Sequence, residues 1–208
     1  MNVDVLDIQE LYRGFFRLLR MKMRYQRFDG NMSREVHLEI LERGDAAAVL
    51  LYDPHRDQVG LIRQFRPGPH LRGESGWTTE IVAGSCGSEP DPQAVAWRET
   101  REETGWTPDS LRLIQVFYLS PSGSSERIHL YCGLFDSSTS PVAGGGLEQE
   151  GEDIQPVIVP FATAWQWLED RTLNSAIAIL AMQWLKLNRS ELRTRAMKDN
   201  CQSPCQGP

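Results

Sequence analysis

The stretch Ala83–Trp106, AGSCGSEPDPQAVAWRETREETGW, decides how the rest of the chain is interpreted. Asp91 is a favoured N-cap residue, and Pro92 suits the first position of a helix. Gly105 is the residue type expected just after a helix ends. Together these signals predict one helix between residues 91 and 105.

Three glutamates lie on one face of this predicted helix, because Glu99, Glu102 and Glu103 are spaced three and four residues apart. Like charges at this spacing repel each other by a few tenths of a kcal/mol. A hard divalent cation with oxygen ligands would relieve that repulsion. The alternative is a solvated acidic face with local pairing to Arg98 and Arg101, and this spacing alone favours that alternative.

Outward from the helix, short apolar runs alternate with polar connections. The pattern predicts strands at 46–52, 59–65, 78–82, 113–119, 128–135 and 154–159, and helices at 161–169 and 174–187. In the last helix, Ile177, Leu180, Trp184 and Leu187 form the expected apolar stripe. Pro- and Gly-rich composition predicts loops at 67–76 and 136–153.

The N-terminal part has a different pattern. Residues 19–26 alternate apolar with polar side chains, and residues 36–41 do so again after the turn signal Asp29-Gly30. We expect a two-stranded hairpin, which must pack on the main domain or on a second subunit because isolated hairpins are marginally stable. The predicted organisation is a β extension over 1–43, a main domain over 44–196 and a disordered tail over 197–208.

The composition describes a folded globular protein. The 208 residues are 40% hydrophobic and 24% charged, with a net charge of −6. This charge argues against a general nucleic-acid partner. No apolar run reaches the roughly 18 residues of a membrane span, and the acidic N-terminus is unlike a signal peptide. We therefore expect a cytoplasmic protein without nucleic-acid or membrane partners.

The four cysteines have no spacing typical of a zinc site. They are expected to be free thiols in a reducing compartment. A redox pair of Cys201 and Cys205 is the alternative.

The segment Ala83–Trp106 resembles the signature of the Nudix hydrolases, Gly-x5-Glu-x7-Arg-Glu-U-x-Glu-Glu-x-Gly-U, where U is apolar. The matching positions are Gly84, Arg98, Glu99, Glu102, Glu103 and Gly105. Two positions depart from it: Pro90 replaces the first glutamate, and Thr100 stands at an apolar position. In the family that glutamate pairs with the signature arginine, and Glu89 or Asp91 is a candidate for the same role here.

The resemblance implies an α/β/α sandwich with a mixed sheet, to which the N-terminal antiparallel β-hairpin is an extension that builds a homodimer. It implies Mg²⁺, with Mn²⁺ as a substitute, held by the Ala83 carbonyl, Glu99 and Glu103. In the acidic loop at 147–153 it implies Glu150 as the catalytic base and Glu152 as a further metal ligand, with Glu148 as the alternative base. Bound cations would neutralise an anionic pyrophosphate and activate water.

Within the family, the chain is similar to bacterial ADP-ribose pyrophosphatases from about residue 11 to residue 187. The features include Glu42–Gly44, Gln64–Arg66 and Pro121, which lies 15 residues after Trp106. This similarity implies Mg²⁺-dependent hydrolysis of ADP-ribose to AMP and ribose 5-phosphate. The alternatives are hydrolysis of GDP-mannose or NADH, and a sensor that binds ADP-ribose without cleaving it.

The same similarity suggests which residues contact the substrate. The candidates are Phe15 and Phe16 for adenine, Arg43 and Arg66 for the phosphates, Ser120 and Glu126 for the terminal ribose, and Glu39 for the ribose or adenine across a dimer. For most of them a structural role is the alternative: core packing for the aromatic residues, surface salt bridges for the arginines and a capped turn for Ser120 and Glu126.

Overall fold

The computed structural model describes residues 1–139, 145–147, 149 and 151–202, the last four by their backbone alone. The chain forms two compact units. The N-terminal unit comprises Met1–Asp45 and Phe117–Ile128, and the main unit comprises Ala46–Val116 and the residues from His129 onward. No helix in the described part combines the length and the hydropathy needed to cross a membrane.

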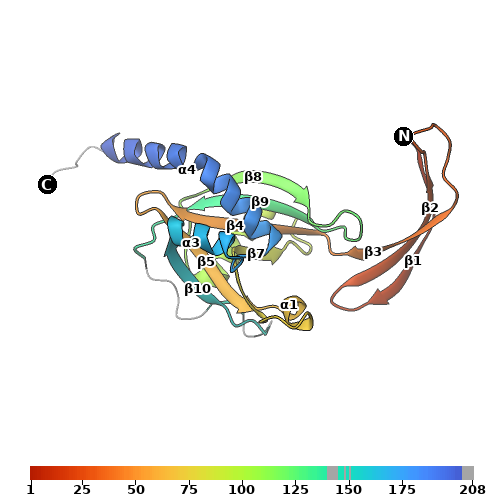
Figure 1. Ribbon diagram of the computed structural model, residues 1–208, viewed down its shortest axis with the longest axis horizontal. Helices are drawn as coiled ribbons and strands as arrows, with labels where there is room; N and C mark the ends of the chain where they lie inside the picture. Colours follow the sequence, from red (N-terminus) through yellow and green to blue (C-terminus); the bar gives the residue numbers. More distant parts are fainter. Residues whose placement is uncertain (140–144, 148, 150, 203–208) are drawn as a thin grey trace. The chain divides into compact units, whose positions relative to one another are not determined.

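The N-terminal unit contains a three-stranded antiparallel sheet in the order β1 (Val3–Arg13), β2 (Arg17–Tyr25), β3 (Val36–Glu42) (Figure 1). Strands β2 and β3 are the predicted hairpin, and the expected turn residue Gly30 has a φ of 87°. Strand β1 was not expected. Its pairing with β2 shifts register twice, and such irregularities interrupt the period-two pattern that marks a strand in a sequence.

The main unit is built on a seven-stranded sheet in the order β10-β5-β4-β9-β8, with β6 paired to β5 and β7 paired to β4. The strands are β4 (Asp45–Asp53), β5 (Gln58–Phe65), β6 (Trp77–Glu80), β7 (Val82–Ser85), β8 (Ser110–Tyr118), β9 (Arg127–Leu134) and β10 (Gln155–Pro160). Each corresponds to a predicted run, except that the run at 78–82 divides at Ile81 into β6 and β7.

Strand β4 explains why the fold has three layers. Its residues 46–52 are continuously apolar, as expected for a strand that is covered on both faces. Ala47, Val49 and Leu51 join a core cluster with Val95 and Ala96 of α2 (Pro92–Thr104). The alternate residues of β4 are also fully buried, and α3 (Phe161–Glu169) and α4 (Ala176–Gln202) lie over the sheet (Figure 1). The predicted α/β/α sandwich is confirmed.

The signature helix α2 forms as the sequence predicts. The Asp91 side chain accepts a hydrogen bond of 2.9 Å from the backbone N–H of Gln93, which is an N-cap. The helix ends at Gly105, whose left-handed φ of 73° favours glycine. The predicted loop at 67–76 differs from the expectation, because it contains a short helix, α1 (Pro67–Leu71), with prolines in its first turn.

Helix α4 corrects two expectations. It continues to Gln202, so residues 197–202 of the expected disordered tail are helical. The predicted stripe is also wrong, because Leu180 is 44% exposed and Leu187 is 85% exposed. The buried positions of α4 are instead Ala178, Ala181, Met182, Leu185, Leu192 and Ala196. The packed face of α4 therefore contains small alanines that the expected stripe of large apolar residues did not include.

Candidate active site

Glu103 is the most deeply buried carboxylate of the signature helix. It lies in the last turn of α2, it is 2% exposed, and its Oε2 has no hydrogen-bond partner among the described residues. The carboxylate accepts a hydrogen bond from the backbone of Ala83 in β7. Burial, reinforced by the charges of Glu99 and Glu152, raises the pKa of Glu103 to about 9. Burial and the neighbouring carboxylates thus favour the neutral form of this group.

Glu99 lies one turn earlier on α2 and packs directly against Gly84. A Cβ on Gly84 would come within 2.0 Å of the Glu99 Cδ, so any larger residue here would have to displace the Glu99 carboxylate. Burial raises the pKa of Glu99 even though Arg98 donates a hydrogen bond of 2.6 Å to it. Gly84 therefore allows β7 and the acidic face of α2 to come into contact.

The replacement of the first signature glutamate by Pro90 is compensated within the helix. Arg98 bonds Glu99 at 2.6 Å and Glu102 at 2.7 Å. Glu89 instead accepts from the backbone N–H of Asp91, which itself caps α2. The expectation that Glu89 or Asp91 braces Arg98 is therefore wrong for the described residues. Arg98 is fixed by carboxylates of its own helix.

Glu152 is the third acidic group near this face. Its charge contributes to the raised pKa values of both Glu99 and Glu103, which places it beside them. Its carboxylate accepts a hydrogen bond of 3.0 Å from the backbone N–H of Leu147. Glu148 and Glu150, the two candidate bases, lie outside the described residues.

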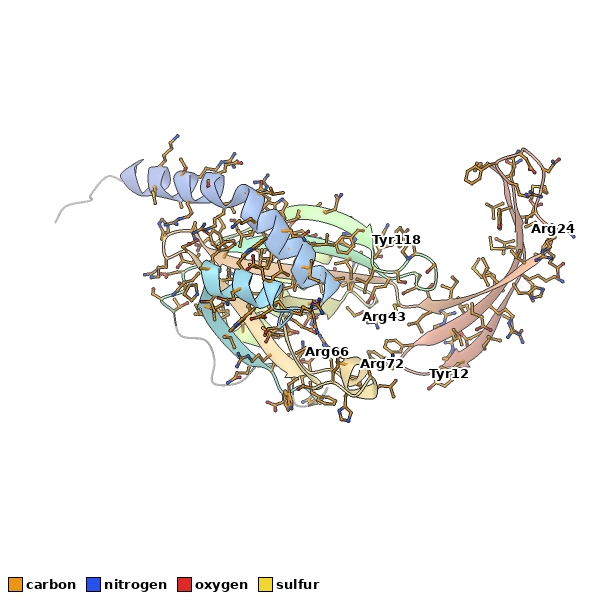
Figure 2. All side chains as sticks on the ribbon, in the orientation of Figure 1. Tyr12, Arg24, Arg43, Arg66, Arg72 and Tyr118 are labelled. Atoms are coloured by element: carbon orange, nitrogen blue, oxygen red, sulfur yellow. The ribbon has the colours of Figure 1, made fainter. Side chains whose placement is uncertain are left out.

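Arg66, labelled in Figure 2, adds a positive charge to this group of residues. It follows β5, and its charge lowers the pKa of Glu103. Its Nε and Nη2 both donate to Glu80 Oε2, at 3.0 and 2.9 Å, while Thr78 Oγ1 donates to Glu80 Oε1 at 2.9 Å. Glu80 was not among the expected site residues. The alternation that puts Thr78 and Glu80 on one face of β6, where Thr78 pairs with Gln64 of β5, was the signal that could have found it.

The donor set of this cluster suits a hard divalent cation, although no three His, Cys, Asp or Glu side chains of the described residues converge on one point. Glu103 offers an unpartnered buried oxygen. Ala83 lies in strand β7, and its backbone N–H donates to Glu103. In an extended strand the N–H and the C=O of one residue point to the same side, so the Ala83 carbonyl also faces this cluster. Carboxylate and carbonyl oxygens are the ligands that Mg²⁺ takes.

A second group of expected site residues lies in the N-terminal unit. The ring centroids of Phe15 and Phe16 are 4.8 Å apart in an edge-to-face arrangement with an interplanar angle of 66°, and the guanidinium of Arg43 lies 4.5 Å from the Phe16 ring centroid. Arg43 Nε bonds Glu126 at 2.8 Å. Phe15 is 92% exposed, so it is not a core residue. Four of the expected substrate contacts are thus brought together.

Glu39 and Ser120 are not joined to that group by any contact that the structure shows. Glu39 bonds Arg20 across the β2–β3 pair, and both side chains are exposed. The Ser120 carbonyl accepts from the backbone N–H groups of Gly123 and Ser124, which is the capped turn considered as its alternative role. The substrate roles of both residues stay predictions.

The chain belongs to the Nudix family. The model of the NUDIX domain matches residues 42–178, a range that includes the signature helix, the preceding loop and the segment with Glu152. The resemblance seen in the sequence is thereby confirmed, and the chain is a Nudix hydrolase.

Its relatives include enzymes of two substrate classes. The ADP-ribose pyrophosphatase of Escherichia coli K12 is 39% identical over 194 residues, which cover 92% of this chain and 91% of the relative. The corresponding Haemophilus influenzae enzyme is 37% identical, with coverages of 92% and 89%. The GDP-mannose pyrophosphatase of Klebsiella pneumoniae is 30% identical, with coverages of 89% and 92%.

A solved structure described as an ADP compounds hydrolase shares the fold. It superimposes with a TM-score of 0.65 at 21% sequence identity and covers 93% of this chain and 97% of its own. This match supports the fold assigned above.

Proposed function

We propose that the protein hydrolyses the pyrophosphate of ADP-ribose to AMP and ribose 5-phosphate in a Mg²⁺-dependent reaction. The observation that carries the proposal is the buried Glu103 carboxylate, with its unpartnered Oε2, beside Glu99 and Glu152. The higher identity to ADP-ribose pyrophosphatases than to GDP-mannose pyrophosphatases favours ADP-ribose as the substrate.

The proposed metal ligands are the Ala83 carbonyl, Glu99, Glu103 and Glu152. Bound Mg²⁺, or Mn²⁺ in its place, supplies positive charge that neutralises the phosphoryl oxygens and lowers the pKa of water. Glu150 is the proposed base that takes the proton of the attacking water, with Glu148 as the alternative. Arg66, held by two hydrogen bonds to Glu80, presents a fixed guanidinium for a phosphate oxygen.

The proposed substrate contacts in the N-terminal unit are Phe15, Phe16, Arg43 and Glu126, together with Glu39 and Ser120. An exposed aromatic pair is suited to stack on a flat base, and Arg43 over Phe16 combines a cation with a ring. The apolar side chains exposed on β1, which include Val5, Ile8 and Tyr12, support the proposed homodimer. A cytoplasmic location is part of the same proposal.

The test measures AMP release from ADP-ribose by the purified protein with Mg²⁺, against GDP-mannose and NADH. We expect ADP-ribose to have the highest kcat/KM, and Glu103→Gln to lower kcat about 100-fold or more with the fold retained. Glu74→Gln, which changes an exposed carboxylate of the same unit, is the matched control.

Three outcomes would contradict the proposal. Full turnover by Glu103→Gln removes the metal role of this residue. Faster cleavage of GDP-mannose assigns the other substrate. Tight ADP-ribose binding without AMP release identifies a sensor.

A further inference from the structure

The segment that carries Glu152 is joined to the end of the signature helix by backbone contacts. Gly145 and Ile154 exchange two hydrogen bonds, from Gly145 N–H to the Ile154 carbonyl at 2.7 Å and in the reverse direction at 3.2 Å. Gly146 N–H donates to the Glu102 carbonyl at 3.0 Å. That carbonyl belongs to the last turn of α2, where carbonyls lack partners within the helix. The segment therefore completes the hydrogen bonding of the helix end.

Both glycines are required by the space around them. A Cβ on Gly145 would lie 1.7 Å from the carbonyl oxygen of Glu103, which is backbone and cannot rotate away. A Cβ on Gly146 would lie 2.7 Å from the Cβ of Glu152, and its φ of 86° also favours glycine. A side chain at Gly145 has to move the segment away from α2, and a side chain at Gly146 has to move Glu152 itself.

We propose that Gly145 and Gly146 are positioning residues that hold the Glu152 carboxylate at a fixed place beside Glu99 and Glu103. The inference rests on the proposed function, because it gives Glu152 its purpose as a metal ligand. Gly146 fixes the start of the segment to α2, and the Leu147 N–H holds the Glu152 carboxylate at 3.0 Å. The position of the third carboxylate thus depends on contacts made through the backbone of two glycines.

The consequence of a single methyl group follows from these distances. An added Cβ needs more than 3 Å from a backbone oxygen, so Gly145→Ala must displace the segment by more than 1 Å. Groups that orient metal ligands typically change metal affinity by about 10–100-fold when they are mutated. A shift of about 1 Å in a catalytic arrangement can cost on the order of 100-fold in rate.

The experiment measures Mn²⁺ affinity of the full-length protein by electron paramagnetic resonance of the free ion. Gly145→Ala and Gly146→Ala are expected to weaken Mn²⁺ binding about 10–100-fold. Gly68→Ala is the matched control for Gly145, because a Cβ there meets nothing within 4 Å. Gly73→Ala, with a φ of 82° and open space around it, is the control for Gly146.

Thermal unfolding and ADP-ribose kinetics complete the test. A positioning role predicts a fall in kcat and in Mn²⁺ affinity with a smaller change in the KM for ADP-ribose. Unchanged Mn²⁺ affinity in a folded Gly145→Ala variant overturns the inference, as does an equal loss in the two control variants. The wild-type protein is titrated with Mn²⁺ first. If it binds no Mn²⁺, the proposed metal site is wrong, and this result is distinct from a failure of the inference about Gly145 and Gly146.

Discussion

Replacing Glu103 by glutamine should stabilise the metal-free protein, and the size of the effect follows from the pKa of the buried carboxyl. The pKa is about 9 in the folded protein against an ordinary value of 4.5. Because the folded state holds this proton more tightly, the stabilising contribution is complete below pH 4.5 and is lost as the pH rises toward 9. Glutamine matches the protonated carboxyl in shape and does not titrate.

Between pH 5 and pH 7.5 the loss amounts to about 1.4 kcal/mol per pH unit, or about 3 kcal/mol in total. The quantity to compare is the free energy of unfolding of Glu103→Gln minus that of the wild type. We expect this difference to be about 3 kcal/mol larger at pH 7.5 than at pH 5. The other titrating groups are common to both proteins and cancel in this difference.

The assay is urea unfolding in excess EDTA at the two pH values, with Glu74→Gln as the control for a general charge effect. Saturating Mg²⁺ should then stabilise the wild type more than the variant, because only the wild type keeps the charged ligand. The reasoning is refuted if the difference between wild type and Glu103→Gln is the same at pH 5 and pH 7.5.

Three further substitutions have expected outcomes. Gly84→Ala should weaken Mn²⁺ binding at least about tenfold, since its Cβ would meet Glu99 at 2.0 Å; unchanged affinity would contradict this packing argument. Glu80→Gln should lower kcat/KM for ADP-ribose about tenfold by freeing Arg66, with Mn²⁺ affinity retained. Asp57→Ala should lower the free energy of unfolding by about 1–3 kcal/mol in urea without altering kcat, because it removes the acceptor that anchors α4 to the β4–β5 turn.

Local signals in the sequence predicted the signature helix well. Asp91, Pro92 and Gly105 act through hydrogen bonds and backbone angles within a few residues, so their effect is visible without the fold. Strand β4 and the first part of β5 were predictable from local sequence too, because burial leaves continuous apolar runs.

The missed features depend on contacts between distant parts of the chain. Strand β1 is held by β2 through a ladder with two register shifts, which its own sequence does not reveal. The packed face of α4 includes Ala178 and Ala181, whose burial is decided by the sheet beneath them rather than by hydrophobicity.

The candidate active site also contains some residues that local sequence predicts and others that depend on distant contacts. Glu99 and Glu103 are predictable because helix geometry fixes their common face. Glu80 acts on Arg66 from another strand, 14 residues away, and the role of Gly145 and Gly146 depends on a helix end more than 40 residues earlier in the chain. Neither arrangement follows from local patterning.

The N-terminal unit is built from two segments that are far apart in the sequence, and this has a consequence for synthesis of the protein. The unit closes through bonds between the end of β3 and the segment 117–128, including Arg43 N–H to Ser125 Oγ across 82 residues. At a translation rate of about 5–20 residues per second, the first 45 residues wait roughly 4–16 s for those partners to be made. During that interval the end of β3 lacks these hydrogen-bond partners, so we expect the N-terminal sheet to stay incompletely stabilised until residue 128 has been made. A fragment that ends near residue 45 should therefore be less stable than the complete unit.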